Sequence, residues 1–207
     1  ITICLWYKTE SSYWGALVSN HDHAMPDNGY QVTSSSLYGN GGFIYFECAY
    51  NDDRDGQSTH ASFNDGEWHF VSAVYTPDGS SRGRIYVDGI LQSGYFWGGS
   101  VALPAIGATP EYALTIGSAK EQAWFEGIID EVSIWDRALS LEEIRTNMYT
   151  SLTGLESGLV GYWPFNEGTG STVNDYSSNN NHGTIDGATW VSSDAPLGGY
   201  YFYANPY

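Results

Sequence analysis

The feature that most constrains the fold is a series of short segments rich in β-branched and aromatic residues, most of them bounded by Gly, Asn, Asp or Pro. Several alternate apolar and polar residues with a period of two, which is typical of half-buried strands. The segments are 1–7, 42–50, 69–75, 84–89, 113–118, 128–135, 159–165 and 182–191. Many strands at this spacing predict an all-β sandwich or jelly roll.

The sequence predicts one short helix beside these strands. Ser140 is a good N-cap and Glu143 follows three residues later, which is the pattern of a capping box. Leu141, Ile144 and Met148 would share one face of a helix that ends near Met148. A helix of this length is too short to build a helical domain.

The organisation predicted for the chain is a single domain over 1–207. Residues 1–150 form the main body, 151–158 form a linker, and 159–207 supply strands that complete the sandwich. About 50 residues with few strands bury too little apolar surface to fold alone, which disfavours a separate domain. The alternative is that 159–207 begins the next repeat of a tandem array.

Two blocks of sequence resemble a known family. Residues 63–71 give a turn followed by Trp68-His69 and a strand, and 83–89 give a strand ending Tyr-Val-Asp-Gly. Residues 125–140 place Asp-Glu-Val in a strand that leads into the short helix. These blocks resemble the laminin-G-like domains of the concanavalin A-like superfamily. The resemblance implies a two-sheet antiparallel jelly roll.

The order of the parts departs from that family. Residues 159–190 resemble the family's first strands, yet they come last in this chain. Residues 199–207 followed by 1–3 would be nearly continuous in the usual order. The domain is therefore either circularly permuted or a register-shifted slice of a tandem array, and the sequence leaves both open.

The opening residues 1–10 also resemble the pentraxin branch of the superfamily, including the position of Cys4. Pentraxins pair this cysteine with one on the strand that matches 69–75, and that strand has no cysteine here. Two possibilities remain: a disulfide from Cys4 to Cys48, or two buried free thiols.

The same resemblance implies a calcium site. Asp27 and Asn28 lie where pentraxins carry an Asp-Asn pair of calcium ligands, and Glu121 with Gln122 resembles the second half of that site. Ca²⁺ takes six to eight oxygen ligands, which loops at one end of a sandwich can supply. The second pair is displaced by about two residues, and Ala123 stands where an Asp would follow. The alternative is two solvated polar loops.

Two other acidic segments are weaker metal candidates. Residues 51–56 mimic the start of an EF-hand loop, but Ser62 takes the twelfth position, so a solvated hairpin tip is preferred. Glu167 and Asp175 could hold a structural Ca²⁺ together with Asp130, or they could cap loops through Asx turns. The loop-capping interpretation is preferred.

Aromatic residues in or beside loops form the predicted ligand-binding set. Aromatic faces with polar neighbours can stack on sugar rings, and clustered exposed rings usually mark a binding surface. The predicted residues are Trp14, Tyr30, Tyr38, Trp97 and Trp124, of which Trp14 and Trp97 are the sharpest. The alternative for each is packing of a loop over the sandwich.

No catalytic constellation is recognised. Glycosidases need two carboxylates across a cleft, whereas Asp130 and Glu131 are adjacent in one strand and would point to opposite faces. His21 and His23 lack a clear third ligand, so zinc is poorly supported. We therefore expect a protein that is not an enzyme.

Charge narrows the range of partners. Lys and Arg number 7 against 24 Asp and Glu, a formal net charge of −17. This field repels nucleic acids and anionic membranes and favours neutral glycans over acidic ones.

The sequence thus predicts a non-catalytic carbohydrate-binding or adhesion module, bound to Ca²⁺. It would belong to a larger secreted or cell-surface protein with covalently linked neighbouring domains. The alternative is a structural spacer or protein-interaction repeat with no glycan ligand.

Overall fold

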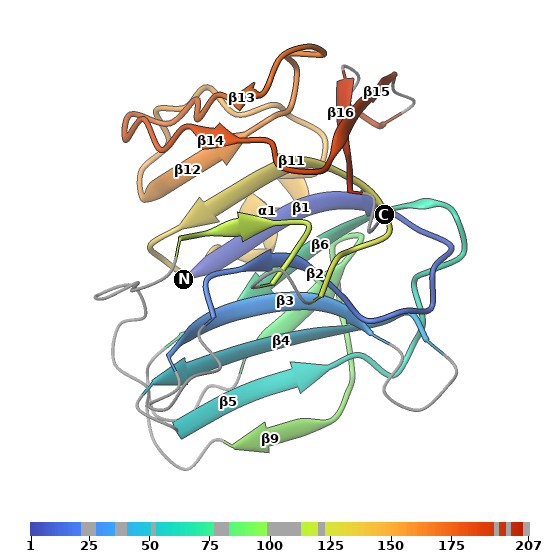
Figure 1. The fold of residues 1–207 in the computed structure, drawn as a ribbon. Coiled ribbons are helices and arrows are strands. Elements are labelled where there is room, and N and C mark those ends of the chain that lie inside the picture. Colours follow the sequence, from blue (N-terminus) through green and yellow to red (C-terminus); the bar gives the residue numbers. More distant parts are fainter. Residues whose placement is uncertain are drawn as a thin grey trace.

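Two antiparallel sheets pack face to face, as Figure 1 shows. The computed structural model describes residues 1–21, 28–35, 41–50, 53–76, 83–98, 113–119, 123–192, 195–197 and 200–204. The order of strands in the larger sheet is β15 (Thr189–Ser192), β16 (Tyr200–Ala204), β11 (Gly127–Trp135), β1 (Thr2–Lys8), β6 (Trp68–Val74), β7 (Arg84–Val87), β8 (Ile90–Leu91). One more strand, β12 (Leu159–Trp163), pairs with β11 beside this series. This architecture confirms the predicted jelly-roll sandwich.

The second sheet has six strands among the described residues. Its order is β10 (Thr115–Ile116), β2 (Gly15–Ser19), β3 (Gly29–Ser35), β4 (Phe43–Tyr50), β5 (Asp53–Ser58), β9 (Phe96–Gly98). Two further strands, β13 (Thr172–Val173) and β14 (Gly183–Thr184), pair with each other in a small antiparallel sheet. Each of the eight predicted segments contains a strand. The hairpin expected around 51–56 is present, since β4 and β5 pair up to Tyr50 and Asp53; Asp53 and Arg54 are exposed, whereas Asp55 and Gly56 are buried within β5.

The main core lies between the sheets and is built by strict alternation. In β1, Ile3, Leu5 and Tyr7 enter this core, while Cys4 and Trp6 face the opposite side of the sheet. In β4, alternate residues from Ile44 to Cys48 do the same from the second sheet. Successive side chains therefore alternate between the main core and the opposite face of the sheet, which in β1 is also buried.

A second apolar cluster covers the outer face of the larger sheet. The helix α1 (Leu141–Asn147) begins with the predicted capping box, in which Ser140 and Glu143 bond reciprocally. Ile144 and Met148 pack onto Trp6, Trp135 and other residues of the sheet, whereas Leu141 is exposed. Of the three residues predicted to share one face of the helix, two are therefore buried and Leu141 is partly exposed.

The C-terminal strands extend the sheet that begins at the N-terminus. On the edge of β11 opposite to β1, β12 pairs with Val132–Trp135 and β16 pairs with Gly127–Ile129. Thr2 pairs with Trp135, whereas Ala204 pairs with Gly127, so the two described ends lie at opposite ends of β11. That separation is roughly 25 Å for a strand of this length. Both explanations of the strand order, a permutation and a slice of a tandem array, therefore stay predictions.

The two cysteines are free and buried. Cys4 lies in the cluster under α1, and Cys48 lies in the core between the sheets, so the larger sheet separates them. Of the two possibilities left open by the sequence, the structure has two free thiols. Burial raises the pKa of Cys4 to about 12, which makes it a poor nucleophile.

Candidate functional site

The outer face of the six-stranded sheet carries an aromatic pair. Alternation in β4 sends Ile44 and Phe46 into the core, so Tyr45 and Glu47 face away from it. In the register of the sheet, Glu47 lies opposite Gly56 of β5, and Gly56 lies opposite Trp97 of β9. The sequence therefore places these side chains in one row across three strands.

Trp97 is held in one place by this row. Its Nε1–H donates a hydrogen bond to Glu47 Oε2 at 3.1 Å. The centroid of its ring lies 6.0 Å from the centroid of the Tyr45 ring. A Cβ added to Gly56 would come within 2.4 Å of Trp97 Cζ2, so only glycine leaves room for the indole over the strand. Trp97 and Tyr45 remain half-exposed, so the pair forms a fixed aromatic surface open to solvent.

Glu47 anchors the site and gathers several donors. Its side chain is 12% exposed, and its Oε1 lies 3.4 Å from Gln31 Nε2, 3.4 Å from His21 Nε2 and 3.7 Å from Arg54. These contacts fix the carboxylate that orients Trp97. Tyr45, Glu47 and Gly56 were not among the predicted ligand-binding residues, although alternation in 42–50 places Tyr45 and Glu47 on one face of the strand.

The other predicted aromatic residues fall into three groups. Trp14 and Trp124 are each 44% exposed and lie on neighbouring segments at another part of the sandwich. Tyr30 is the second residue of β3 and is 8% exposed within the main core, so it packs in the core and is not an exposed ring for a ligand. Tyr38 lies outside the described residues.

The calcium prediction can be placed only in part. Asn28 lies directly before β3, whereas Asp27, Glu121 and Gln122 lie outside the described residues. Within the described part of the chain, no group of three or more His, Cys, Asp or Glu side chains could hold a metal ion. The calcium site at Asp27, Asn28, Glu121 and Gln122 therefore stays a prediction.

Asp175 and Glu167 cap loops. Asp175 accepts hydrogen bonds from the backbone N–H groups of Tyr162, Ser177 and Asn181 at 2.8–2.9 Å. Burial raises the pKa of Asp175, but these bonds outweigh it and lower the pKa below its usual value. Glu167 accepts from the backbone and side chain of Asn174. These bonds match the loop-capping interpretation.

Asp130 and Glu131 are buried at a bulge in β11. One extra residue opposes β1 here, and Glu131 has φ +52°, so the simple alternation expected from sequence does not hold. Asp130 is fully buried. Glu131 is 6% exposed, and its carboxylate accepts a hydrogen bond from the Tyr162 hydroxyl. Burial, and then the neighbouring Glu131 charge, raise the pKa of Asp130 to about 9. These carboxyl groups lie inside the sheet, away from the aromatic row.

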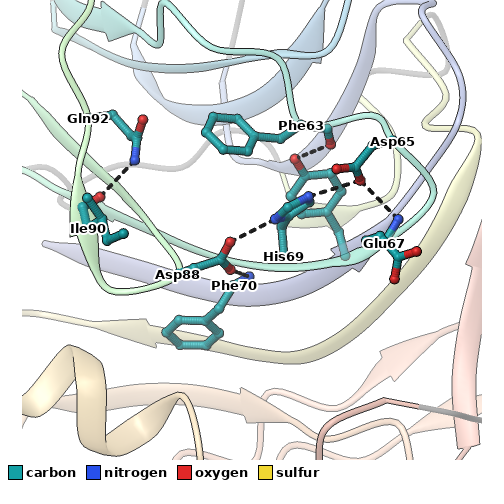
Figure 2. A network of polar contacts seen from close by, with 9 residues as sticks. Phe63, Asp65, Glu67, His69, Phe70, Asp88, Ile90 and Gln92 are labelled. Carbon is teal, nitrogen blue, oxygen red and sulfur yellow. Dashed lines mark hydrogen bonds and ion pairs between the residues drawn. The ribbon is translucent and has the colours of Figure 1, made fainter.

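The Trp-His and Tyr-Val-Asp-Gly motifs meet in a polar network (Figure 2). His69 Nδ1 lies 2.8 Å from Asp88 Oδ2, and Nε2 lies 3.1 Å from Asp65 Oδ1. Asp88 also accepts from the Phe70 N–H, and Asp65 accepts from the Glu67 N–H. The bond to Asp88 is the main cause that raises the pKa of His69, against the effect of burial. The network joins two turns and is structural.

Comparisons with known proteins agree with this architecture. A family model described as the concanavalin A-like lectin/glucanases superfamily, of laminin G type, matches residues 1–145. A rat protein, "Sushi, von Willebrand factor type A, EGF and pentraxin domain-containing protein 1", is 27% identical over 177 residues, covering 79% of this chain. The chain spans 4% of the length of that protein.

Two solved structures share the fold. A protein of Bacteroides ovatus ATCC 8483, proposed to bind carbohydrate, superposes with a TM-score of 0.72 at 16% identity, over 95% of this chain and 54% of its own. The CBM40 of a Ruminococcus gnavus IT-sialidase, bound to α2,3 sialyllactose, gives 0.53 at 16% identity, over 70% of this chain and 80% of its own. With the family model matching most of its length, this chain belongs to the laminin-G-like family of the concanavalin A-like lectin/glucanases superfamily.

Proposed function

We propose that the chain is a non-catalytic carbohydrate-binding module that binds a glycan on the outer face of its six-stranded sheet. The observation that carries the proposal is the fixed aromatic pair of Trp97 and Tyr45. Trp97 is held by Glu47 and seated over Gly56, so the ring needs no ordering when a ligand arrives. An aromatic surface that is already ordered loses little entropy on binding, which favours weak polar ligands such as sugars.

The contacts of this site fit a sugar ring. The apolar C–H face of a pyranose stacks on an indole or phenol ring, and the polar side chains around it offer bonds to hydroxyl groups. Arg54 is 43% exposed at the margin of the row, 3.7 Å from Glu47, and offers donors there. A single site of this kind binds weakly, so the module would gain strength from several copies or linked modules.

The proposal extends to the ligand class and the setting. The net charge of −17 favours neutral glycans over acidic ones. Membership of a lectin-containing superfamily and the multidomain rat relative support a parent protein with linked domains, secreted or displayed at a cell surface. No helix in the described part of the chain is long and apolar enough to span a membrane.

Calcium is part of the proposal because the residues Asp27, Asn28, Glu121 and Gln122 offer oxygen ligands of the type that Ca²⁺ prefers. The Asp27→Ala variant is expected to weaken calcium binding measured by calorimetry. An unchanged affinity would remove the site from the proposal without touching the aromatic surface.

The first test is a glycan array that includes neutral and sialylated glycans, probed with millimolar Ca²⁺ and again with EDTA. Neutral hits that survive EDTA are the expected result for the aromatic surface, with calcium structural at most. Hits that vanish in EDTA would indicate that the glycan binds at the predicted calcium loops around Asp27 and Glu121 instead. Binding to sialylated glycans alone would contradict the predicted neutrality, and no hits would favour a structural spacer or a protein-binding repeat.

The second test uses Trp97→Ala with Phe96→Ala as its matched control. Phe96 is the neighbouring residue on β9 and is 46% exposed, so this variant perturbs the same strand without removing the indole. Trp97→Ala should weaken the neutral hits about tenfold or more with only a small change in melting temperature, whereas Phe96→Ala should leave them unchanged. Equal binding by both variants would refute the site.

A further inference from the structure

A second aromatic cluster lies at the margin of the sandwich opposite to Trp97. Segments 13–16 and 123–125 run side by side, with the Ala16 N–H donating to the Ala123 carbonyl at 3.0 Å. A Cβ on Gly15 would come within 2.5 Å of Phe125 Cα and 2.8 Å of the Trp124 carbonyl oxygen. Glycine at this position therefore permits the close approach, which brings the backbones that carry Trp14 and Trp124 side by side although they are distant in sequence.

The rings of this cluster are exposed on a rigid base. Tyr13 is 77% exposed, and Trp14 and Trp124 are each 44% exposed. The residue after Trp124 is Phe125, which is 2% exposed and packs edge-on to Tyr7 of β1 with ring centroids 6.1 Å apart. The backbone on both sides of the rings is thus fixed to the main core, so their exposure does not come from a frayed loop.

Polar groups frame the same cluster. Ser11 Oγ donates to Glu126 Oε2 at 2.8 Å, and Thr9 Oγ1 donates to the Glu126 carbonyl at 2.6 Å. The Tyr13 N–H donates back to Ser11 Oγ at 3.2 Å, and Asn64 Nδ2 donates to the Ser11 carbonyl at 3.3 Å. Hydroxyl and carboxylate groups of residues close in sequence to the three rings therefore form an ordered network, which can exchange bonds with ligand hydroxyls.

We infer that Tyr13, Trp14 and Trp124 form a second glycan-binding site, which makes the module bivalent toward a neutral polysaccharide. The inference takes its ligand class from the proposed function but stands on different residues. Three aromatic side chains expose at most about 150–250 Å² each, well below the roughly 800 Å² per partner of a standard protein interface. That area suits two or three sugar rings, and the net charge of −17 opposes an anionic membrane or polymer.

The two sites are far enough apart to take separate sugar units. Trp14 directly precedes β2, and Trp97 lies in β9, four strand spacings away in the order β2-β3-β4-β5-β9. At about 4.8 Å per spacing the two residues are roughly 19 Å apart across the sheet. The register places Trp97 level with Ser19, five residues from Trp14, which adds about 17 Å along the strand and makes the separation roughly 25 Å. A polymer chain can therefore occupy both sites, and the second contact forms at a high effective concentration.

The test compares the binding of polymers and of short oligosaccharides to four proteins and one control variant. The proteins are wild type, Trp97→Ala, the pair Trp14→Ala/Trp124→Ala, and the combination of all three, with Tyr149→Ala as an exposed aromatic control on the helix side. The probes are soluble mixed-linkage β-glucan, galactomannan and amylopectin with their hexasaccharides, measured by affinity electrophoresis and calorimetry. For the polymer that binds, we expect each site variant to lose about tenfold or more in apparent affinity and the combination to lose all binding.

The outcomes separate the two proposals. Polymer affinity within twofold of wild type for Trp14→Ala/Trp124→Ala overturns the second site, while a loss with Trp97→Ala still supports the first. Loss with the Trp14/Trp124 pair and none with Trp97→Ala overturns the first site alone. No binding of any probe to wild type contradicts both.

A spectroscopic measurement on the wild-type protein guards against a variant that fails to fold. Indole N–H resonances of ¹⁵N-labelled tryptophan are assigned with Trp14→Phe, Trp97→Phe and Trp124→Phe, then followed as the hexasaccharide is added. Shifts of the Trp14 and Trp124 signals along with that of Trp97 are expected. Movement of Trp97 alone would refute the second site.

Discussion

The two sheets of this sandwich differ in what lies on their outer faces. The larger sheet is buried on both sides, by the core between the sheets and by the cluster under α1. On the outer face of the six-stranded sheet, Gln31, Thr33 and Glu47 are largely buried, and Tyr45 and Trp97 are partly exposed. An apolar outer face that packs against a helix gains stability, whereas a polar face with partly exposed rings can take a ligand.

The largest expected effect comes from the covered outer face. Trp135 is 1% exposed between the larger sheet and α1, so Trp135→Ala should lower the free energy of unfolding by about 3–5 kcal/mol. Tyr45 is partly exposed on the outer face of the six-stranded sheet, so Tyr45→Ala should cost below about 1.5 kcal/mol. Urea unfolding of both variants measures the difference. Equal costs would mean that the two outer faces are equivalent in stability.

The next effect concerns the carboxyl group inside the doubly covered sheet. Because the folded-state pKa of Asp130 is raised to about 9, its ionisation opposes folding, and stability falls as pH rises from about 4 toward 9. Asp130→Asn removes this cost and should stabilise the protein at pH 8 by on the order of 1–3 kcal/mol, with no gain at pH 4. Urea unfolding in EDTA at both pH values measures it, and destabilisation at pH 8 would show that the ionised carboxylate is needed.

Asp175 provides the contrast in a loop. Its pKa is lowered, so its carboxylate stabilises the fold above the unfolded pKa and loses that effect as pH falls. Asp175→Asn should therefore destabilise at pH 8 by about 1–2 kcal/mol, opposite in sign to Asp130→Asn. The same unfolding series measures both, and equal signs would remove the distinction between the sheet interior and the loops.

The smallest effect belongs to the network of Figure 2 at the end of the larger sheet. With both ring nitrogens against carboxylates, His69 donates to Asp65 and Asp88 together only when protonated. Its pKa is raised, so its contribution is complete below the unfolded pKa of about 6.5 and is lost as pH rises through the folded pKa. His69→Gln should cost about 1 kcal/mol at pH 5.5 and less at pH 9. An equal cost at both pH values, by urea unfolding, would show that the proton is not involved.

Particular residues explain which strands could be predicted. β1, β6 and β11 carry apolar side chains toward two clusters, so their sequences are nearly continuous in β-branched and aromatic residues. β5, with the sequence DRDGQS, has no such pattern and is a strand because β4 and β9 pair with it on both sides. The capping box of α1 was readable because its two residues act locally.

The sequence by itself determined the all-β class and the position of the helix, because alternation, turns and capping are local properties of the chain, and its motifs carried the resemblance to the family. Tertiary structure decided which aromatic residues lie together and which are core. Tyr30 and Trp97 have similar loop-like surroundings in the sequence, yet one is buried in β3 and the other is seated over Gly56. That difference follows from strand register, which sets the face and the neighbours of each side chain through contacts between distant residues.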